Sequence, residues 1–371
     1  MQFIDLRAQY NALKEDIDAG IFNVLEHGKY ISGPEVRELE KELAEYVGIK
    51  HCITCANGTD ALELSLIALG ITEGDAVFVP SFTFMSTAEV VSSIKATPIF
   101  VDIDASTFNM SPESLEIAIE SVLAENLLRA KAIIPVDLFG QPANYPEILK
   151  IARKYDLKVI EDGAQGFGGA IEEKKACSFG DLSTTSFFPA KPLGCYGDGG
   201  AIFTDDDALS TLLRSLCVHG KGVQKYDNVR IGRNSRLDTM QAAILLPKLR
   251  AFADYEVDAR NEAALYYTEC LNGRYKTPHV PNGYVSSWAQ YTLWVDAEDR
   301  DALQQRLKDH GVPSMIYYPR PLHMQPAFSE VRSYGIDLSV SERASKCVLS
   351  IPMHPYLDKK TMEKIVAVLL A

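Results

Sequence analysis

The chain of 371 residues has no apolar run of about 18 residues, the length that a membrane-spanning helix requires. Its first ten residues, MQFIDLRAQY, include an acid at Asp5 and no apolar stretch of the kind that forms the core of a signal peptide. Both absences argue against a membrane or secreted protein. We therefore expect a cytoplasmic protein with no membrane partner.

A disulfide framework is also missing. The seven cysteines are an odd number scattered from Cys52 to Cys347, which fits a reducing compartment. Cys52 and Cys55 have the spacing of a zinc or redox pair, but no second pair accompanies them. Buried structural thiols are the favoured interpretation, and no metal site is predicted.

Basic residues are in deficit. The chain has 37 Lys and Arg against 50 Asp and Glu, a net charge of −13, and no stripe of basic residues interrupts that excess. Such a surface repels nucleic acid and anionic membranes, so neither is expected as a partner. An anionic substrate would need a few arginines placed locally to receive it.

What is present is typical of an ordinary globular protein, with 47% hydrophobic and 23% charged residues, and the length favours two domains. Short apolar runs alternate with helical patterns such as that of 35–47. This rhythm predicts an α/β fold with a mostly parallel sheet. The runs lie at 76–80, 98–104, 131–137, 157–162, 184–188 and 200–205.

A long helical pattern over 240–272, interrupted only by Pro247, is interpreted as the connector into a smaller domain. Beyond it come a strand-like 290–296, a helix-like 301–311, an apolar MIYY at 315–318 and a terminal helix after Asp358. We predict a large α/β domain over residues 1–245 and a smaller α+β domain over residues 246–371.

The stretch SFFPAKPLGCYGDGG, residues 186–200, fixes Lys191 between Pro189 and Pro192. Apolar neighbours lower the pKa of an amine, which is what a lysine that forms a Schiff base needs. The alternative is a surface lysine. A Walker A loop has its glycines before the lysine, and no G-x-G-x-x-G follows a strand, so nucleoside triphosphate and dinucleotide sites are excluded.

Two further features point to the same chemistry. Asp162 closes the strand-like 157–162 at the edge where ligands gather, and a carboxylate there can keep a pyridine nitrogen protonated. Asn57, Gly58 and Thr59 lead into a helix from about residue 60, whose free N–H groups would bind a phosphate. The alternatives are a helix cap for Asp162 and a simply capped helix after Asn57.

Taken together and in order, six segments resemble the DegT/DnrJ/StrS family of sugar aminotransferases. They are CANGTDAL, PSFTFMSTAE, VDIDASTFNM, IEDGAQGFG, TSFFPAKPLGCYGDGGAI and RNSRLDTMQAAIL, and the likeness runs from IDLRAQY near the start to SIPMHPYLD near the end. The resemblance implies an aspartate-aminotransferase-like, fold type I enzyme that uses pyridoxal 5′-phosphate (PLP) as a homodimer.

The resemblance also implies roles for individual residues. Lys191 matches the lysine that binds the cofactor covalently, and Asp162 matches the partner of the pyridine nitrogen. Gln165 matches the contact to the ring hydroxyl, and Phe84 sits where an aromatic stacks on the ring. The phosphate contacts match Gly58, Thr59, Ser186 and, supplied by the other subunit, Asn234, which predicts an active site across a dimer interface.

Four residues resemble positions on the substrate side. Arg236 is placed to receive an anionic group such as a carboxylate or diphosphate, for which a guanidinium is suited. Tyr317, Tyr318 and His323 resemble the segment that reaches the sugar. A surface arginine and ordinary buried aromatics are the alternatives. Gly163 stands where relatives usually have alanine, a change of no consequence for the assignment.

The implied activity is transfer of an amino group from L-glutamate to a nucleotide-linked keto sugar. Relatives with histidine at the position of Lys191 perform dehydration, so the lysine favours transamination. SFFPAKPLGCYGDGGAIF with RLDTMQAAILLPKL most resembles enzymes that aminate a UDP-linked 2-acetamido-2-deoxy-3-oxo-hexuronic acid for surface polysaccharide such as O-antigen. The alternatives are a dTDP-linked 3-oxo-6-deoxyhexose and a non-catalytic PLP-binding regulator, against which the intact Lys191, Asp162 and Ser186 argue.

Overall fold

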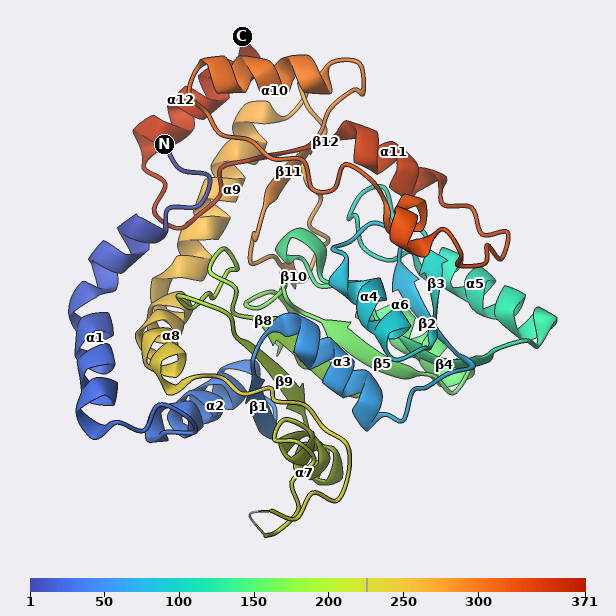
Figure 1. Ribbon diagram of the computed structural model, residues 1–371. Helices are drawn as coiled ribbons and strands as arrows, with labels where there is room; N and C mark the ends of the chain where they lie inside the picture. Colours follow the sequence, from blue (N-terminus) through green and yellow to red (C-terminus); the bar gives the residue numbers. More distant parts are fainter. Residues whose placement is uncertain (225) are drawn as a thin grey trace.

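A seven-stranded sheet forms the centre of the computed structural model, which describes residues 1–224 and 226–371 (Figure 1). The strand order is β1-β9-β8-β5-β4-β2-β3, and only β9 runs antiparallel to its neighbours β1 and β8. The predicted α/β fold with a mostly parallel sheet is confirmed. The strands are β1 His51–Cys55, β2 Asp75–Pro80, β3 Thr97–Val101, β4 Arg129–Ile133, β5 Lys158–Asp162, β8 Leu182–Ser186 and β9 Gly200–Thr204.

Helices cover both faces of this sheet, because its strands are apolar on both sides. On β2, Phe78 packs into a cluster with α5 and α6, whereas its neighbour Val79 packs into a cluster with α3 and α4, which lie in front of the sheet in Figure 1. The first layer holds α2 Pro34–Val47, α5 Pro112–Glu125, α6 Tyr145–Lys154 and α8 Thr239–Ala251, and the second holds α3 Gly58–Ala68, α4 Ser86–Ser93 and α7 Asp207–Leu216.

The predicted helical connector continues through Pro247 as α8, a π-helical segment η2 Phe252–Glu256 and α9 Val257–Leu271. It leads to the antiparallel pair β11 Tyr291–Trp294 and β12 Val348–Ile351, which pack with α10 Arg300–Asp309 and α12 Lys359–Leu370. The predicted domain boundary at 245/246 falls within α8, so the division into two domains stays a prediction. No helix among the described residues is long and apolar enough to cross a membrane.

The remaining elements are short or peripheral to the sheet. α1 Leu6–His27, which the sequence patterns did not single out, packs along α8. The first turn of α11 Ser339–Cys347 is capped by Asp102, whose carboxylate accepts the N–H groups of Val340 and Ser341 at 2.9 and 2.8 Å. The others are η1 Leu138–Gly140, β6 Ala170–Ile171, β7 Lys174–Lys175, β10 Tyr284–Val285, η3 Leu322–Met324 and η4 Pro326–Phe328.

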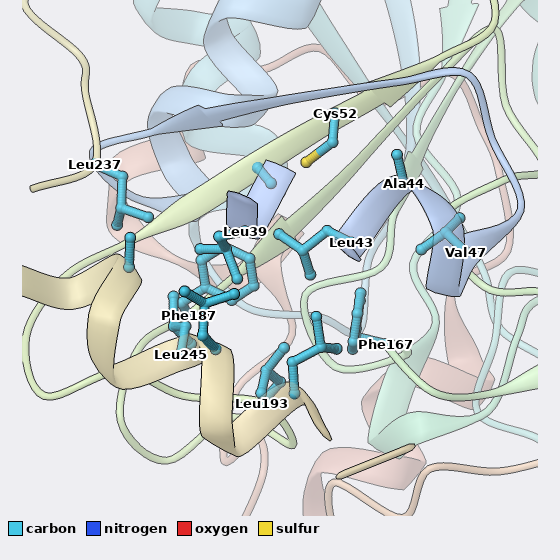
Figure 2. Packing of buried hydrophobic residues seen from close by; sticks show 14 of the residues in the cluster. Leu39, Leu43, Ala44, Val47, Cys52, Phe167, Phe187, Leu193, Leu237 and Leu245 are labelled. Carbon is cyan, nitrogen blue, oxygen red and sulfur yellow. The ribbon is translucent and has the colours of Figure 1, made fainter. Parts of the chain in front are cut away.

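One hydrophobic cluster joins α2, α8 and the segment around Lys191. Figure 2 shows Leu39 of α2 and Leu245 of α8 beside Phe187, with Leu193 below them in the same group. Phe187 and Leu193 are both almost completely buried and flank the lysine in sequence. The segment that carries Lys191 is therefore anchored in the core on both sides.

Two carboxyl groups meet inside the layer formed by α5 and α6. Asp137 accepts hydrogen bonds through Oδ1 from the N–H of Ala143 and the hydroxyl of Tyr145, at 2.9 and 2.8 Å. Its other side faces Glu161 of β5, and burial together with that neighbouring charge raises the pKa of Asp137 well above its usual value. A proton held between the two carboxyl groups removes one of the two buried charges.

Asp137→Asn should make stability less dependent on pH. The folded wild type keeps a proton that the unfolded chain releases above about pH 4, so its stability falls as the pH rises through this window. The amide keeps the acceptor and offers Glu161 an N–H in place of the proton. The free energy of unfolding of the variant relative to the wild type should rise with pH, by at most about 1.4 kcal/mol per pH unit.

Denaturant unfolding of the cofactor-free protein between pH 5 and pH 8 measures this difference. Replacement of the exposed Glu45 by Gln serves as the control. A difference between variant and wild type that does not change with pH would show that no proton is held there.

Candidate active site

A cavity of about 370 Å³ lies where β5 and β8 end. Because these strands are parallel, their carboxyl ends meet at the same edge of the sheet. The cavity is lined by all the predicted cofactor-binding residues of this chain except Asn234, and by two of the predicted substrate residues. They are Gly58, Thr59, Phe84, Asp162, Gln165, Ser186, Lys191, Tyr317 and Tyr318.

Asp162 is the last residue of β5 and is buried, with its carboxylate held from two sides. Oδ2 accepts the hydroxyl of Thr87 at 3.0 Å, and Oδ1 accepts the N–H of Ala164 at 3.2 Å. Burial raises the pKa of Asp162, while Lys191 and these two hydrogen bonds favour the charged form. Thr87, on α4, is a contact that the sequence reasoning missed.

Lys191 faces the same cavity and is partly buried. Its backbone N–H donates to the carbonyl of Phe188 at 2.9 Å, which closes a tight turn. Burial lowers the pKa of its amine, and the charge of Asp162 opposes that effect. A lysine with a lowered pKa supplies the neutral amine that attacks a carbonyl.

The start of α3 forms an anion-binding corner. The side chain of Asn57 accepts the N–H of Asp60 at 2.7 Å, and the first turn leaves the N–H groups of Gly58 and Thr59 without intrahelical acceptors. A Cβ on Gly58 would lie 2.7 Å from the Cβ of Ser186, so only glycine lets the hydroxyl of Ser186 come this near the helix start.

Aromatic and amide groups form another part of the cavity wall. Phe84 is 53% exposed although it is a large apolar side chain, and its ring centroid lies 6.3 Å from that of Tyr318. Gln165 accepts the N–H of Phe139 at 2.9 Å and donates to the hydroxyl of Tyr318 at 3.3 Å. Burial raises the pKa of Tyr318, so the phenol stays protonated.

His323 does not line the cavity as the structure describes it. Its Nδ1 lies 2.6 Å from the hydroxyl of Ser81 and its Nε2 lies 3.4 Å from Glu342. Ser81 follows β2 and also accepts the N–H of Leu322 through its carbonyl, at 2.7 Å. The histidine therefore ties η3 to the segment that leads to Phe84, and a contact to substrate remains a prediction.

Asn234 and Arg236 also lie outside the described lining of this cavity. They flank Ser235, which is buried and whose hydroxyl accepts the N–H of Ala56 at 3.1 Å. Asn234 is exposed and Arg236 is partly buried, and the guanidinium of Arg236 donates to the side-chain oxygen of Asn234. The two side chains are therefore available to a second chain, and their roles remain predictions.

Comparison with known proteins places these features in a family. The model of the DegT/DnrJ/EryC1/StrS aminotransferase family matches residues 11–370. The UDP-2-acetamido-2-deoxy-3-oxo-D-glucuronate aminotransferase of Pseudomonas aeruginosa is 48% identical over 370 residues, which cover 100% of this chain and 99% of that protein.

Two solved structures have the same fold as this chain. A DegT DnrJ EryC1 StrS aminotransferase from Brucella abortus is 50% identical with a TM-score of 0.98, covering 100% of this chain and 98% of that one. NtdA from Bacillus subtilis with bound cofactor PMP is 31% identical with a TM-score of 0.87, covering 97% of this chain and 82% of that one.

Enzymes of this family depend on PLP, and the residues of the cavity fit that cofactor. The space left by the missing Cβ of Gly58 is a corner for a phosphate beside Ser186. The cavity also contains a buried carboxylate, which suits the pyridine nitrogen of PLP, and an amine of lowered pKa, which suits its aldehyde.

Asp162→Asn should lower the pKa of Lys191 further in the cofactor-free protein, because the carboxylate is the charge that stabilises its ammonium form. The chemical shifts of labelled lysine side chains, followed by NMR as a function of pH, measure this pKa. Asp137→Asn is the control, since Asp137 does not line the cavity, and an equal decrease there would mean that Asp162 has no special influence.

Proposed function

The chain belongs to the DegT/DnrJ/EryC1/StrS aminotransferase family, and we propose that it transfers the amino group of L-glutamate to the 3-oxo group of UDP-2-acetamido-2-deoxy-3-oxo-hexuronic acid. The observation that carries this proposal is the meeting of Asp162, Lys191 and the anion corner of α3 in one cavity. The full-length likeness to the Pseudomonas enzyme supports the UDP-linked acid over a dTDP-linked 3-oxo-6-deoxyhexose. We assign the enzyme to surface polysaccharide synthesis, such as that of O-antigen, in the cytoplasm.

Besides the covalent bond from Lys191 and the contact from Asn234 of the second chain, six residues would hold the cofactor. Gly58, Thr59 and Ser186 would bind its phosphate, Phe84 would lie against the ring, Gln165 would contact the ring hydroxyl, and Asp162 would accept a hydrogen bond from the pyridine nitrogen. When bound, PLP supplies an electron sink for the pair released at the substrate carbon. The hydrogen bonds from Thr87 and Ala164 keep the carboxylate of Asp162 charged and aimed for that contact.

Lys191 is the group that moves protons. With its amine free, it takes the proton from the α-carbon of glutamate, and burial helps because it lowers the pKa of the amine and so favours the neutral form that accepts a proton. In the second half of the cycle the same amine returns a proton to the sugar carbon that receives nitrogen. Tyr317 and Tyr318 line the same cavity and would contact the sugar.

A homodimer would complete the site. The segment that precedes Asn234 exposes Val223, Val229 and Ile231, with Val223 fully exposed. Apolar surface of this kind marks a protein interface. In the dimer we propose, Asn234 and Arg236 of each chain reach the cavity of the other. Arg236 supplies the cation that an anionic substrate needs on a protein with a net charge of −13.

The holoenzyme should convert glutamate to 2-oxoglutarate, one per site, and lose its PLP absorbance as it does so. Lys191→Ala should form none, and Asp162→Asn should react at least about 100-fold more slowly, because the positioned proton carrier or the charge on the ring nitrogen is lost. Rapid-mixing absorbance and product analysis measure both. A protein that binds PLP but yields no 2-oxoglutarate would be a regulator instead.

The acceptor is identified by adding keto sugars to the aminated enzyme. The UDP-linked 3-oxo-hexuronic acid should restore the PLP absorbance faster than the dTDP-linked 3-oxo-6-deoxyhexose. Faster return with the dTDP sugar would favour the alternative, and return with non-nucleotide ketones only would end the sugar assignment.

Mixed dimers test the shared site. Lys191→Ala and Asn234→Ala should each be nearly inactive alone, because each removes one half of every site. After the two are unfolded and refolded together, half of the dimers should carry one complete site, which restores about a quarter of the wild-type activity. The same mixture without exchange of subunits is the control. No gain after exchange would mean that Asn234 serves its own chain.

A further inference from the structure

Lys248 of α8 is a lysine with no exposed surface. It lies between Leu246 and Leu249, two members of a buried hydrophobic cluster, whereas lysine side chains are normally found at the protein surface. An ammonium group taken out of water is costly unless protein groups replace its hydration. The contacts of Lys248 therefore have to account for its position.

Those contacts are with the loop that follows Lys191. The amine of Lys248 donates to the carbonyl of Gly194 and lies 4.7 Å from the ring centroid of Tyr196. Gln241, two turns earlier on the same helix face, accepts the N–H of Tyr196 at 2.9 Å. One face of α8 thus holds the loop at two successive points.

The loop transmits these contacts to the catalytic lysine. The N–H of Cys195 donates to the carbonyl of Phe187 at 2.8 Å, and the N–H of Lys191 donates to that of Phe188 at 2.9 Å. A Cβ on Gly194 would lie 2.6 Å from the carbonyl oxygens of Phe188 and Pro189, so this turn is closely packed. A shift of Gly194 must therefore move the segment on which Lys191 stands.

The titratable groups near Lys248 belong to the same continuous helix and to the loop. Burial lowers its pKa to about 8, while Glu256 and Cys195 act in the opposite direction. Glu256 has no exposed surface either, and its carboxylate accepts from Gln9 of α1 at 2.9 Å and from Tyr356 at 2.7 Å. The amine therefore donates to the loop from a site that the surrounding fold holds rigidly.

We propose that Lys248 is a positioning residue, which sets the place of Lys191 in the cavity through the carbonyl of Gly194. This assignment rests on the proposed role of Lys191 in proton transfer. Lys248 touches neither the cavity nor, on this arrangement, the reacting atoms. Its effect should consequently appear in the rate of the chemical step and in the order of the loop, and much less in the binding of substrate.

Lys248→Met keeps the length of the side chain and removes the donor. In the cofactor-free protein, amide hydrogen exchange of a peptide covering residues 192–199 should become about tenfold faster, with exchange in β5 unchanged. In the holoenzyme, kcat of the glutamate half-reaction should fall about tenfold while KM changes less than about twofold, since a small misplacement of a catalytic group costs rate. Lys175→Met is the matched control, because Lys175 also lies over a tyrosine ring, 4.3 Å from that of Tyr46, but belongs to β7.

Two further variants make the result decisive. Lys248→Gln retains an N–H donor and should keep most of the loop protection and of kcat. Gln241→Leu removes the second anchor without altering a buried charge, so it should loosen the same peptide even if Lys248→Met does not fold. Wild-type protection of the loop in both Lys248→Met and Gln241→Leu, or faster exchange spread evenly over the chain, would overturn the proposal. A wild-type enzyme that fails to react with glutamate would overturn the proposed function instead, and the exchange results would still test whether α8 holds the loop.

Discussion

Two adjacent carboxylates at the end of β5 set the arrangement of the whole site. Because side chains alternate along a strand, Glu161 and Asp162 point to opposite faces of the sheet. Glu161 accepts hydrogen bonds from the N–H of Phe179 and the hydroxyl of Ser183 and faces Asp137, which pins the strand from the layer of α5 and α6. The strand end held in this way presents Asp162 to Thr87 and to the cavity that Lys191 shares.

The sequence was sufficient for the parts of the fold that carry a strong local pattern. The apolar runs and the long helix of residues 240–272 are visible without a structure, and the structure contains them. α1 was not singled out because only Gln9, Ile17 and Val24 of its 22 residues are buried, too narrow an apolar stripe to stand out. The sequence of β1, HCITC, was not predicted as a strand because its two cysteines have the spacing of a metal or redox pair.

For the site, the residues that the sequence could place are those next to a strand end or a helix start. One cavity is lined by Lys191, Asp162 and Gly58, because the ends of β5 and β8 and the start of α3, which follows β1, meet there. Thr87 could not be found in this way, since its partner Asp162 is 75 positions away and a threonine in the first turn of a helix is ordinary. For His323 and Asn234 the difficulty is different. A motif identifies each residue, but it does not say which chain or which part of the site that residue serves.

The continuous helix from Thr239 to Leu271 links these parts mechanically. Near its start Gln241 and Lys248 hold the loop of Lys191, and beyond the π-helical segment Arg260 donates to the carbonyl of Trp288 at 3.1 Å, beside the small β11–β12 sheet. A π-helical turn shifts the face that a helix presents, so the residues before and after it can meet different neighbours. The same continuous helix therefore contacts both the loop that follows Lys191 and the segment around Trp288 that leads into β11. Two of the charged residues buried along it, Lys248 and Arg260, make these contacts through backbone carbonyls, which replace the water that a buried cation loses.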